Sequence, residues 1–393
     1  MNICFFSFGH ISKTKSGIDR VTDILSTAFR EKGHTVYMIS VCAPVGNDEL
    51  TETQFQLPCS DTKSEENKKF LNDFYTTKGI DIIINQAEQK AIFDLISDTH
   101  NDIPIISCLH CDPRGILKGI HDLWDEHKLK LGWRFYLSFP LHFARAIYQY
   151  YDRRKYISHK YKEYYEKSNA VVLLSDNFRN SFAKLAKING QKKLYAIGNP
   201  NAFSLTETFL ANKEKIVLFV GRLDFQKRVD RLLRIWKRLH KKIPDWKLQI
   251  VGDGTHKTLY EELSNGLKLH SVEFLGKRNP EEYYKKAAIL CVTSSHEGLP
   301  MVIIEALQYN VIPIAFNSFE SLTDTITNGK TGFFIDKFSE KKYSETLISL
   351  ISNKEYRLRI QKNISEDNKT KKNDLYRIVD KWEDLFKCLK STP

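Results

Sequence analysis

The chain has 393 residues, of which 41% are hydrophobic and 27% charged, and its formal net charge is +12. This length exceeds one average hydrophobic core and the composition is globular, so we expect two folded domains and exclude a disordered chain. The excess of basic side chains predicts attraction to an anionic partner, such as a nucleic acid, a membrane surface or a phosphorylated substrate.

The cysteines and the first residues indicate the compartment. Seven cysteines form no dense framework, and several lie in apolar runs, as reduced core cysteines do. The first residues lack a basic leader and predict a strand instead of a signal peptide. No apolar run reaches about 18 residues, so no transmembrane helix is expected. We expect a cytoplasmic protein, with peripheral binding to the inner face of the membrane as an additional expectation.

Short apolar runs alternate with amphipathic stretches in the first half of the chain. Helices are predicted between these runs, for example over 17–32 and 176–187. Because the runs are nearly continuous and do not alternate with polar residues, they predict strands buried on both faces of a parallel sheet. The expected strands are 2–8, 35–40, 81–85, 104–107, 170–175 and 193–199.

A polar stretch over residues 200–214 is predicted to be a linker, after which the pattern restarts. Expected strands are 215–221, 247–252, 271–276, 289–294, 311–316 and 332–335, and expected helices are 227–243, 255–266, 280–287 and 300–309. The chain is therefore predicted to contain two doubly wound α/β domains with right-handed crossovers. In such domains the ligand lies at the carboxyl ends of the strands.

Residues 119–165 interrupt this alternation of strands and helices, since they contain no predicted strand. Residues 128–162 are also unusually basic and aromatic. Pro140 is expected to divide the segment into two helices. Its aromatic side chains could form a helical core, enter the headgroups of an anionic membrane, or stack on nucleic-acid bases. The core and membrane interpretations stay open, and we do not expect a nucleic-acid partner. The aromatic residues concerned are Trp133, Phe135, Phe139, Phe143 and Tyr148.

Two strand ends carry residues suited to an anion. In GRLDFQKRVDRLL, Arg222 and Lys227 flank a loop between a strand and a helix, which predicts either an anion site or a solvated basic helix. VGDG at 251–254 lies in the same kind of position. Its glycines allow a tight turn or the close approach of a ligand, and this short pattern alone favours a turn.

The stretch SSHEGLPMVIIEAL carries two acids, Glu297 and Glu305, eight positions apart. Pro300 suits a first helical turn, which places Glu297 before the helix and Glu305 within it. The backbone amides of Gly298–Met301 would then be available to anionic or hydroxyl ligands. Without a ligand, Glu297 would only stabilise the helix dipole and Glu305 would be a surface charge.

EGLPMVIIEA resembles the E-x7-E signature of retaining glycosyltransferases of the GT-B fold, in the large family 4 type. The stretches GRLDFQKRVDRLL, PDWKLQIVGDG, VEFLG, SSHEGLPMVIIEAL and GKTGFFI occur in the order usual for that family, so the resemblance covers nearly the whole chain. It implies two doubly wound Rossmann-like domains that face a central cleft. We expect an acceptor-side domain over 1–205, a nucleotide-sugar-binding domain over 206–372, and a terminal helix over 373–393 that returns to the first domain.

The resemblance also implies roles for single residues. Glu305 is similar to the acid that accepts hydrogen bonds from the nucleotide ribose, and Glu297 to the acid that holds the donor sugar. Arg222 and Lys227 resemble the pair that binds the donor diphosphate, beneath a loop that Gly17 allows to close. His110 resembles the histidine that lies near the transferred sugar. The residues implied to line the donor beside Glu297 are Gly298, Leu299, Pro300 and Met301.

Three positions depart from the family pattern. Ser16 precedes Gly17 where many relatives carry two glycines, and Asn310 stands where a glycine often ends the helix, although asparagine also adopts the left-handed conformation. The stretch 317–326 lacks the Gly-Pro that usually precedes the acidic position, here Asp324. The resemblance therefore leaves the donor sugar open.

No Asp-x-Asp stretch is present to hold a divalent ion, so we expect no metal and no cofactor. Arg222, Lys227 and helix starts would then stabilise the negative charge of the leaving diphosphate. This effect needs a closed, partly dry cleft, so domain closure is expected. CLHC at 108–111 resembles a metal or redox motif, but a second cysteine pair is missing.

The sequence therefore predicts a metal-independent retaining glycosyltransferase that moves a hexosyl unit from a nucleotide sugar to an acceptor hydroxyl. The resemblance implies a UDP-linked donor and an acceptor in a bacterial surface glycan, such as capsule, O-antigen or exopolysaccharide, which can be lipid-linked. Two alternatives stay open: a nucleotide-sugar isomerase of the same fold, and a non-catalytic partner subunit.

Overall fold

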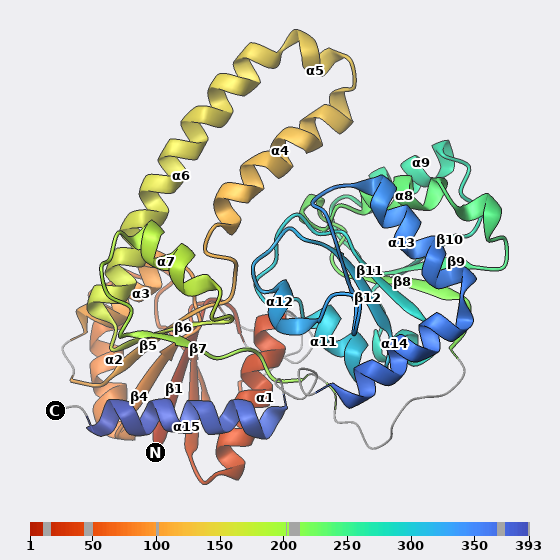
Figure 1. Ribbon diagram of the computed structural model, residues 1–393. Helices are drawn as coiled ribbons and strands as arrows, with labels where there is room; N and C mark the ends of the chain where they lie inside the picture. Colours follow the sequence, from red (N-terminus) through yellow and green to blue (C-terminus); the bar gives the residue numbers. More distant parts are fainter. Residues whose placement is uncertain are drawn as a thin grey trace. The chain divides into compact units, whose positions relative to one another are not determined.

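The computed structural model describes residues 1–10, 17–42, 50–99, 102–201, 203, 213–367 and 374–391 (Figure 1). The chain divides into two compact units. Unit 1 consists of Met1–Pro113, Arg153–Ala202 and Asn373–Pro393, and unit 2 of Arg114–Asp152 and Phe203–Lys372. Most of the predicted linker, residues 202 and 204–212, lies outside the described residues.

Unit 1 contains a parallel sheet of seven strands in the order β3-β2-β1-β4-β5-β6-β7. All residues of β4, β5 and β6 are buried, as expected where helices cover both faces of a parallel sheet. The strands are β1 (Asn2–Ser7), β2 (Thr35–Ser40), β3 (Gln54–Gln56), β4 (Ile82–Asn85), β5 (Ile105–Leu109), β6 (Ala170–Leu173) and β7 (Leu194–Ala196).

The helices of unit 1 surround this sheet. They are α1 (Gly17–Glu31), α2 (Glu65–Lys78), α3 (Lys90–Asp98), the second half of α6 (Phe139–Lys167), α7 (Phe178–Ala186) and α15 (Leu375–Ser391). Helix α15 buries Ile378, Val379, Trp382, Leu385 and Phe386, whose spacing places them on one face of a helix. Phe29 of α1 packs on this face, with ring centroids 6.3 Å from Trp382 and 5.4 Å from Phe386.

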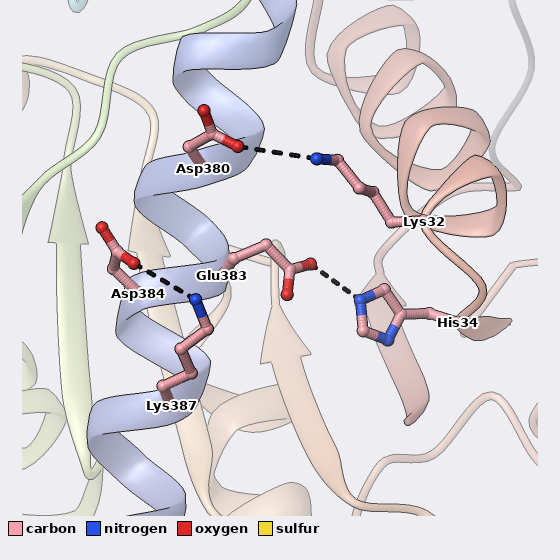
Figure 2. Close-up of a pocket in the computed structure, with 6 residues that line it drawn as sticks. All are labelled: Lys32, His34, Asp380, Glu383, Asp384 and Lys387. Atoms are coloured by element: carbon pink, nitrogen blue, oxygen red, sulfur yellow. Dashed lines mark hydrogen bonds and ion pairs between the residues drawn. The ribbon is translucent and has the colours of Figure 1, made fainter.

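Polar contacts hold the rim of α15, as Figure 2 shows. His34 Nε2 lies 2.7 Å from Glu383 Oε1, and Lys32 pairs with Asp380 at 3.6 Å. These side chains line a charged hollow of about 330 Å³. On the same helix, Cys388 is exposed, whereas the other six cysteines are buried or half-buried.

Unit 2 contains a parallel sheet of six strands in the order β10-β9-β8-β11-β12-β13. The strands are β8 (Ile216–Val220), β9 (Lys247–Val251), β10 (Val272–Gly276), β11 (Ile289–Val292), β12 (Ile312–Phe316) and β13 (Phe333–Ile335). The two parallel sheets, each covered by helices, confirm the predicted doubly wound α/β class.

Helices again cover the sheet of unit 2. They are η1 (Phe225–Lys227), α8 (Val229–Lys237), η2 (His240–Lys242), α9 (Lys257–Gly266), α10 (Glu281–Lys286), α11 (Met301–Gln308), α12 (Leu322–Thr325), α13 (Glu340–Ser352) and α14 (Lys354–Glu366). The core is continuous from Val217 in β8 through Trp236 in α8 to Ile360 in α14. The predicted helix 227–243 is in fact three short helices, because Arg228 adopts φ 52° and separates η1 from α8.

The basic segment forms α4 (Gly115–Leu131), α5 (Arg134–Leu137) and the first half of α6. The break between helices was expected at Pro140 but occurs at Gly132, which ends α4 with φ 55°. Pro140 instead occupies the first turn of α6, where its missing N–H costs no helical hydrogen bond. We expected residues 114–152 in the N-terminal domain. They belong instead to unit 2, because α4 packs on η1.

Among the described helices, none combines the length and the apolar character needed to cross a membrane.

Candidate functional site

Two loops of unit 2 carry most of the predicted site residues. Strands β8 and β11 are neighbours in the sheet, so the segments that follow them meet at its carboxyl edge. Thr293 donates a hydrogen bond to the Lys227 carbonyl at 2.9 Å, and the Ser295 N–H donates to the Gln226 carbonyl at 2.8 Å. These bonds fix the loop that carries Lys227 against the loop that carries Glu297.

Lys227 and Glu297 form a direct ion pair, with Nζ 2.6 Å from Oε1. Their side chains are only 16% and 11% exposed. The lower effective dielectric of such a place makes the attraction between the two charges several times stronger than in water. The structure therefore brings together a cation suited to phosphate and an acid suited to sugar hydroxyls.

Arg222 lies on the same loop but has different surroundings. Its side chain is 74% exposed, and Nη2 lies 3.0 Å from Asp224 Oδ2. Asp224 in turn accepts a hydrogen bond from the Lys227 backbone N–H at 3.3 Å and so caps η1. Arg222 is therefore a solvated charge at the rim, while Lys227 is the more enclosed cation.

Glu305 is buried in α11, with 2% of its surface exposed. The Tyr284 hydroxyl donates a hydrogen bond of 2.9 Å to its Oε2 atom. Tyr284 is fully buried, and its ring stacks parallel to that of Tyr309. The alternative that Glu305 is a surface charge is therefore wrong, and a buried acid with a tyrosine donor is a defined hydrogen-bonding group.

Helix α11 begins one residue later than predicted. Pro300 is extended, with φ −73° and ψ 92°, and its carbonyl accepts the Ile303 N–H at 2.9 Å. Proline has no N–H, so Pro300 cannot supply one of the expected amide donors, which reduces the set to Gly298, Leu299 and Met301. The Gly298 carbonyl accepts a hydrogen bond from the Ser321 hydroxyl, which anchors this turn.

The glycines of VGDG serve the packing of two loops. A Cβ atom on Gly252 would lie 1.9 Å from the Gly221 carbonyl oxygen, and one on Gly254 would lie 2.7 Å from the Leu223 nitrogen. Gly252 also has φ 145°, a conformation that side chains disfavour. The loop after β9 thus lies directly against the loop that carries Arg222, so these contacts alone account for both glycines.

Two predicted site residues belong to unit 1. His110 follows β5. Its backbone N–H donates a hydrogen bond to Glu88 Oε1 at 3.1 Å, and its ring Nε2 contacts the Gln86 side-chain oxygen. Burial lowers the pKa of His110 below the usual value for histidine, so the ring favours its neutral form. Gly17 is the exposed first residue of α1, and residues 11–16 before it lie outside the described residues.

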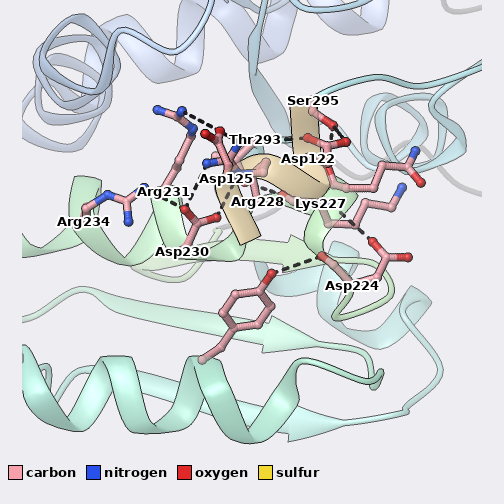
Figure 3. A network of polar contacts seen from close by, with 12 residues as sticks. Asp122, Asp125, Asp224, Lys227, Arg228, Asp230, Arg231, Arg234, Thr293 and Ser295 are labelled. Atoms are coloured by element: carbon pink, nitrogen blue, oxygen red, sulfur yellow. Dashed lines mark hydrogen bonds and ion pairs between the residues drawn. The ribbon is translucent and has the colours of Figure 1, made fainter. Parts of the chain in front are cut away.

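Acids on α4 that were not among the predicted site residues support the Glu297 loop and η1 (Figure 3). Asp122 accepts a hydrogen bond from the Ser295 hydroxyl at 2.6 Å, and Asp125 pairs with the buried Arg228 at 2.6 Å. Glu126 lies 2.8 Å from His256. The signal was present in the sequence, because three acids at i, i+3 and i+4 of one helix interrupt an otherwise basic segment.

No group of three or more histidine, cysteine, aspartate or glutamate side chains suited to a metal ion occurs in the part of the chain that the structure describes. Cys108 is buried in β5, and burial raises the pKa of its thiol well above the usual range. The CLHC stretch is therefore the end of a core strand and the loop that follows it.

Comparisons with known proteins show what this chain is similar to. Residues 203–367 match the family model of glycosyl transferases group 1. The amylovoran biosynthesis glycosyltransferase AmsD of Erwinia amylovora is 31% identical over 230 residues, which cover 56% of this chain and 63% of AmsD. A Campylobacter jejuni α-1,4-N-acetyl-D-galactosaminyltransferase, whose substrate is linked to undecaprenol diphosphate, is 30% identical over 206 residues, covering 51% of this chain and 56% of its own.

The chain thus spans about three fifths of the length of the first curated relatives that it matches, with 63%, 60% and 56% covered. Among solved structures, the TarM mutant of S. aureus in complex with UDP has a TM-score of 0.74 at 13% identity, covering 98% of this chain and 100% of TarM. At that identity the likeness shows the fold alone. Over residues 203–367, the chain is therefore similar to the glycosyl transferases group 1.

Proposed function

We propose that this chain is a retaining hexosyltransferase that transfers a sugar from a UDP-linked donor to an acceptor hydroxyl of a bacterial surface glycan. The observation that carries the proposal is the arrangement at the carboxyl edge of unit 2. There Lys227 and Glu297 form an enclosed pair, and the neighbouring α11 carries the buried acid Glu305.

The donor would bind with its diphosphate at Lys227 and its ribose at Glu305. Two unit charges 4 Å apart attract by about 1 kcal/mol in water and about 4 kcal/mol at an effective dielectric of 20. Lys227 is 16% exposed and Arg222 74% exposed, so Lys227 supplies the larger share of the stabilisation. Arg222 contributes mainly where a bound donor covers it.

The reaction breaks the bond between the anomeric carbon and the diphosphate oxygen and forms one between that carbon and the acceptor oxygen. The acceptor proton moves to the leaving diphosphate, on the same face of the sugar. Glu297 holds hydroxyl groups of the donor sugar, with the amides of Gly298, Leu299 and Met301 beside it. The pKa of His110 is lowered by burial, so its ring is neutral, and its Nε2–H donates to the Gln86 side-chain oxygen. Its Nδ1 atom would then accept a hydrogen bond from a hydroxyl group of the transferred sugar.

The stabilisation of negative charge by Lys227 and amide groups requires no divalent ion, so we propose metal-independent transfer. Activity should persist in a chelator. Loss of activity in a chelator, with recovery on adding Mg²⁺ or Mn²⁺, would contradict this part of the proposal.

The acceptor class rests on the relatives. AmsD is named for amylovoran biosynthesis, and a Klebsiella pneumoniae protein of the cps region is 30% identical over 191 residues. A surface polysaccharide or its lipid-linked precursor is therefore the acceptor that we propose. An isomerase of the same fold would release an altered nucleotide sugar without any acceptor, which analysis of the products distinguishes.

The test is a thermal-shift measurement with UDP and UDP-sugars. UDP should raise the melting temperature of the wild-type protein and fail to raise that of Glu305→Ala or Glu305→Met, since neither side chain carries an oxygen acceptor for the ribose. Glu305→Met keeps a side chain of similar size in the buried site, so it reports on binding even where Glu305→Ala unfolds. Glu345→Ala removes a 61% exposed acid from α13 and should keep the full shift. An unchanged shift in Glu305→Met would refute the ribose role.

A further inference from the structure

Exposed apolar side chains concentrate on one helical segment of unit 2. We call residues 128–152 the arm; it comprises the end of α4, α5 and the first half of α6 (Figure 1). Nine of the sixteen exposed large hydrophobic side chains of the described residues belong to it. A concentration of this kind marks an interaction surface. The nine are Leu131, Trp133, Tyr136, Phe139, Leu141, Phe143, Ile147, Tyr148 and Tyr151.

The arm also has an interior of its own. Phe135 is only 1% exposed, and its ring lies 5.0 Å from that of Trp124 and 5.5 Å from that of His142. The core interpretation of the segment therefore holds for Phe135. It does not hold for Trp133 and Tyr148, which are 70% and 72% exposed.

Basic residues accompany these exposed side chains. From Lys128 to Lys155 the chain has seven lysines and arginines and a single acid, Asp152. Arg145 lies one helical turn from both Leu141 and Tyr148, so cationic and apolar groups share one face of α6. Arg153, Arg154 and Lys155 follow in the next turn of the same helix.

This combination fits the surface of an anionic bilayer better than other partners. Tryptophan and tyrosine favour the headgroup region, and lysine and arginine bind the anionic lipid there. A second copy of the chain would bring like charges together, because the arm is basic and the net charge is +12. A nucleic acid would provide bases for the aromatic rings but no apolar environment for Leu141 and Ile147.

We infer that the arm docks this protein on the anionic face of a lipid bilayer. The exposed aromatic and aliphatic side chains enter the headgroup region, and the lysines and arginines contact lipid phosphates. This interaction is independent of the donor and the acceptor of the proposed transfer reaction, so it can be measured without either.

Flotation of the full chain with lipid vesicles tests the inference. The wild-type protein should bind vesicles of phosphatidylcholine with about a quarter phosphatidylglycerol at least about tenfold more tightly than vesicles of phosphatidylcholine alone. Binding should weaken in high salt. The triple variant Trp133→Ser, Leu141→Ser, Tyr148→Ser should lose at least about tenfold in binding.

A matched control changes exposed apolar residues away from the arm. Leu358→Ser with Tyr376→Ser, whose native side chains are 50% and 67% exposed, should bind anionic vesicles like the wild type. The inference would be overturned if this control lost as much vesicle binding as the triple variant. It would also be overturned if the triple variant bound anionic vesicles as tightly as the wild type. A wild-type dimer that the triple variant disrupts without any lipid dependence would overturn it too, since the arm would then bind a second copy.

Trp133 provides a second readout, because it is the exposed one among the five tryptophans, all of which lie in described positions. Vesicles that contain brominated acyl chains should quench the wild-type fluorescence, and Trp133→Phe should remove most of that quenching. Quenching that persists undiminished in Trp133→Phe would show that Trp133 stays outside the bilayer, and no quenching in the wild type would show this for the whole arm.

Discussion

At the scale of single residues, the contact between Lys227 and Glu297 has two consequences. Each side chain neutralises the other in a place that is largely shielded from water. Loss of one partner leaves the other charge poorly solvated, which is destabilising irrespective of any ligand. Stability and nucleotide binding must therefore be separated when this pair is changed.

We predict that Lys227→Met lowers the free energy of unfolding by about 1–3 kcal/mol, because Glu297 loses its partner. The double variant Lys227→Met, Glu297→Gln should recover most of this loss, since no unpaired charge remains. Neither variant should be stabilised by UDP if Lys227 binds the diphosphate. Chemical denaturation with and without UDP measures both quantities, and a double variant that UDP still stabilises would exclude Lys227 from the donor site.

Gly252 makes a second residue-scale prediction. An alanine Cβ at this position would overlap the Gly221 carbonyl, so Gly252→Ala should cost about 1–3 kcal/mol of stability and displace the loop that carries Arg222. Gly266→Ala is the matched control, since nothing lies within 4 Å of its Cβ position at the end of α9. Denaturation curves that coincide for the two variants would contradict the packing role of Gly252.

At the scale of elements, α15 depends on its aromatic face. Trp382 and Phe386 pack on Phe29 of α1 within unit 1, whereas Tyr376 of the same helix is 67% exposed. Trp382→Ala should lower the free energy of unfolding by about 3–5 kcal/mol, because it removes a large buried side chain. Tyr376→Ala should change it by less than about 0.5 kcal/mol. Equal effects of the two substitutions in a urea titration would contradict this docking.

Most strands could be predicted from the sequence, because a buried parallel strand is a continuous apolar run. The predicted strand 35–40 coincides with β2, and the ends of the other predicted strands differ from the observed ends by at most three residues, the largest difference being at the end of β7. The three-residue β3 was missed, since QFQ carries little apolar signal. The helix break at Arg228 was also missed, because arginine rarely takes a positive φ. Here the surrounding acids and aromatic rings hold Arg228 in this conformation.

The candidate site was predictable in part. The strand-end loops and the start of α11 follow from periodicity and from proline, but the burial of Glu305 depends on Tyr284, which lies 21 residues earlier. The spacing of Asp122 and Asp125 was visible in the sequence, but their contacts with Ser295 and Arg228 could not be predicted, since these contacts depend on how α4 packs in three dimensions. Contacts between residues distant in the chain are the part that local patterns do not contain.

At the scale of the whole molecule, each unit has its own buried core, one around Phe29 and Trp382 and one around Trp236 and Tyr284. Units of this kind can unfold separately. Calorimetry should therefore resolve two transitions. UDP should raise the melting temperature of the transition that belongs to unit 2. Trp382→Ala should lower the melting temperature of the transition that belongs to unit 1. A single transition that both changes shift would show that the two cores unfold together.

The exposed thiol of Cys388 has a practical consequence for such experiments. The remaining cysteines are buried or half-buried, so a maleimide dye should react first at this position of α15 without any engineered site. The dye would then follow the C-terminal helix by fluorescence in the otherwise native chain.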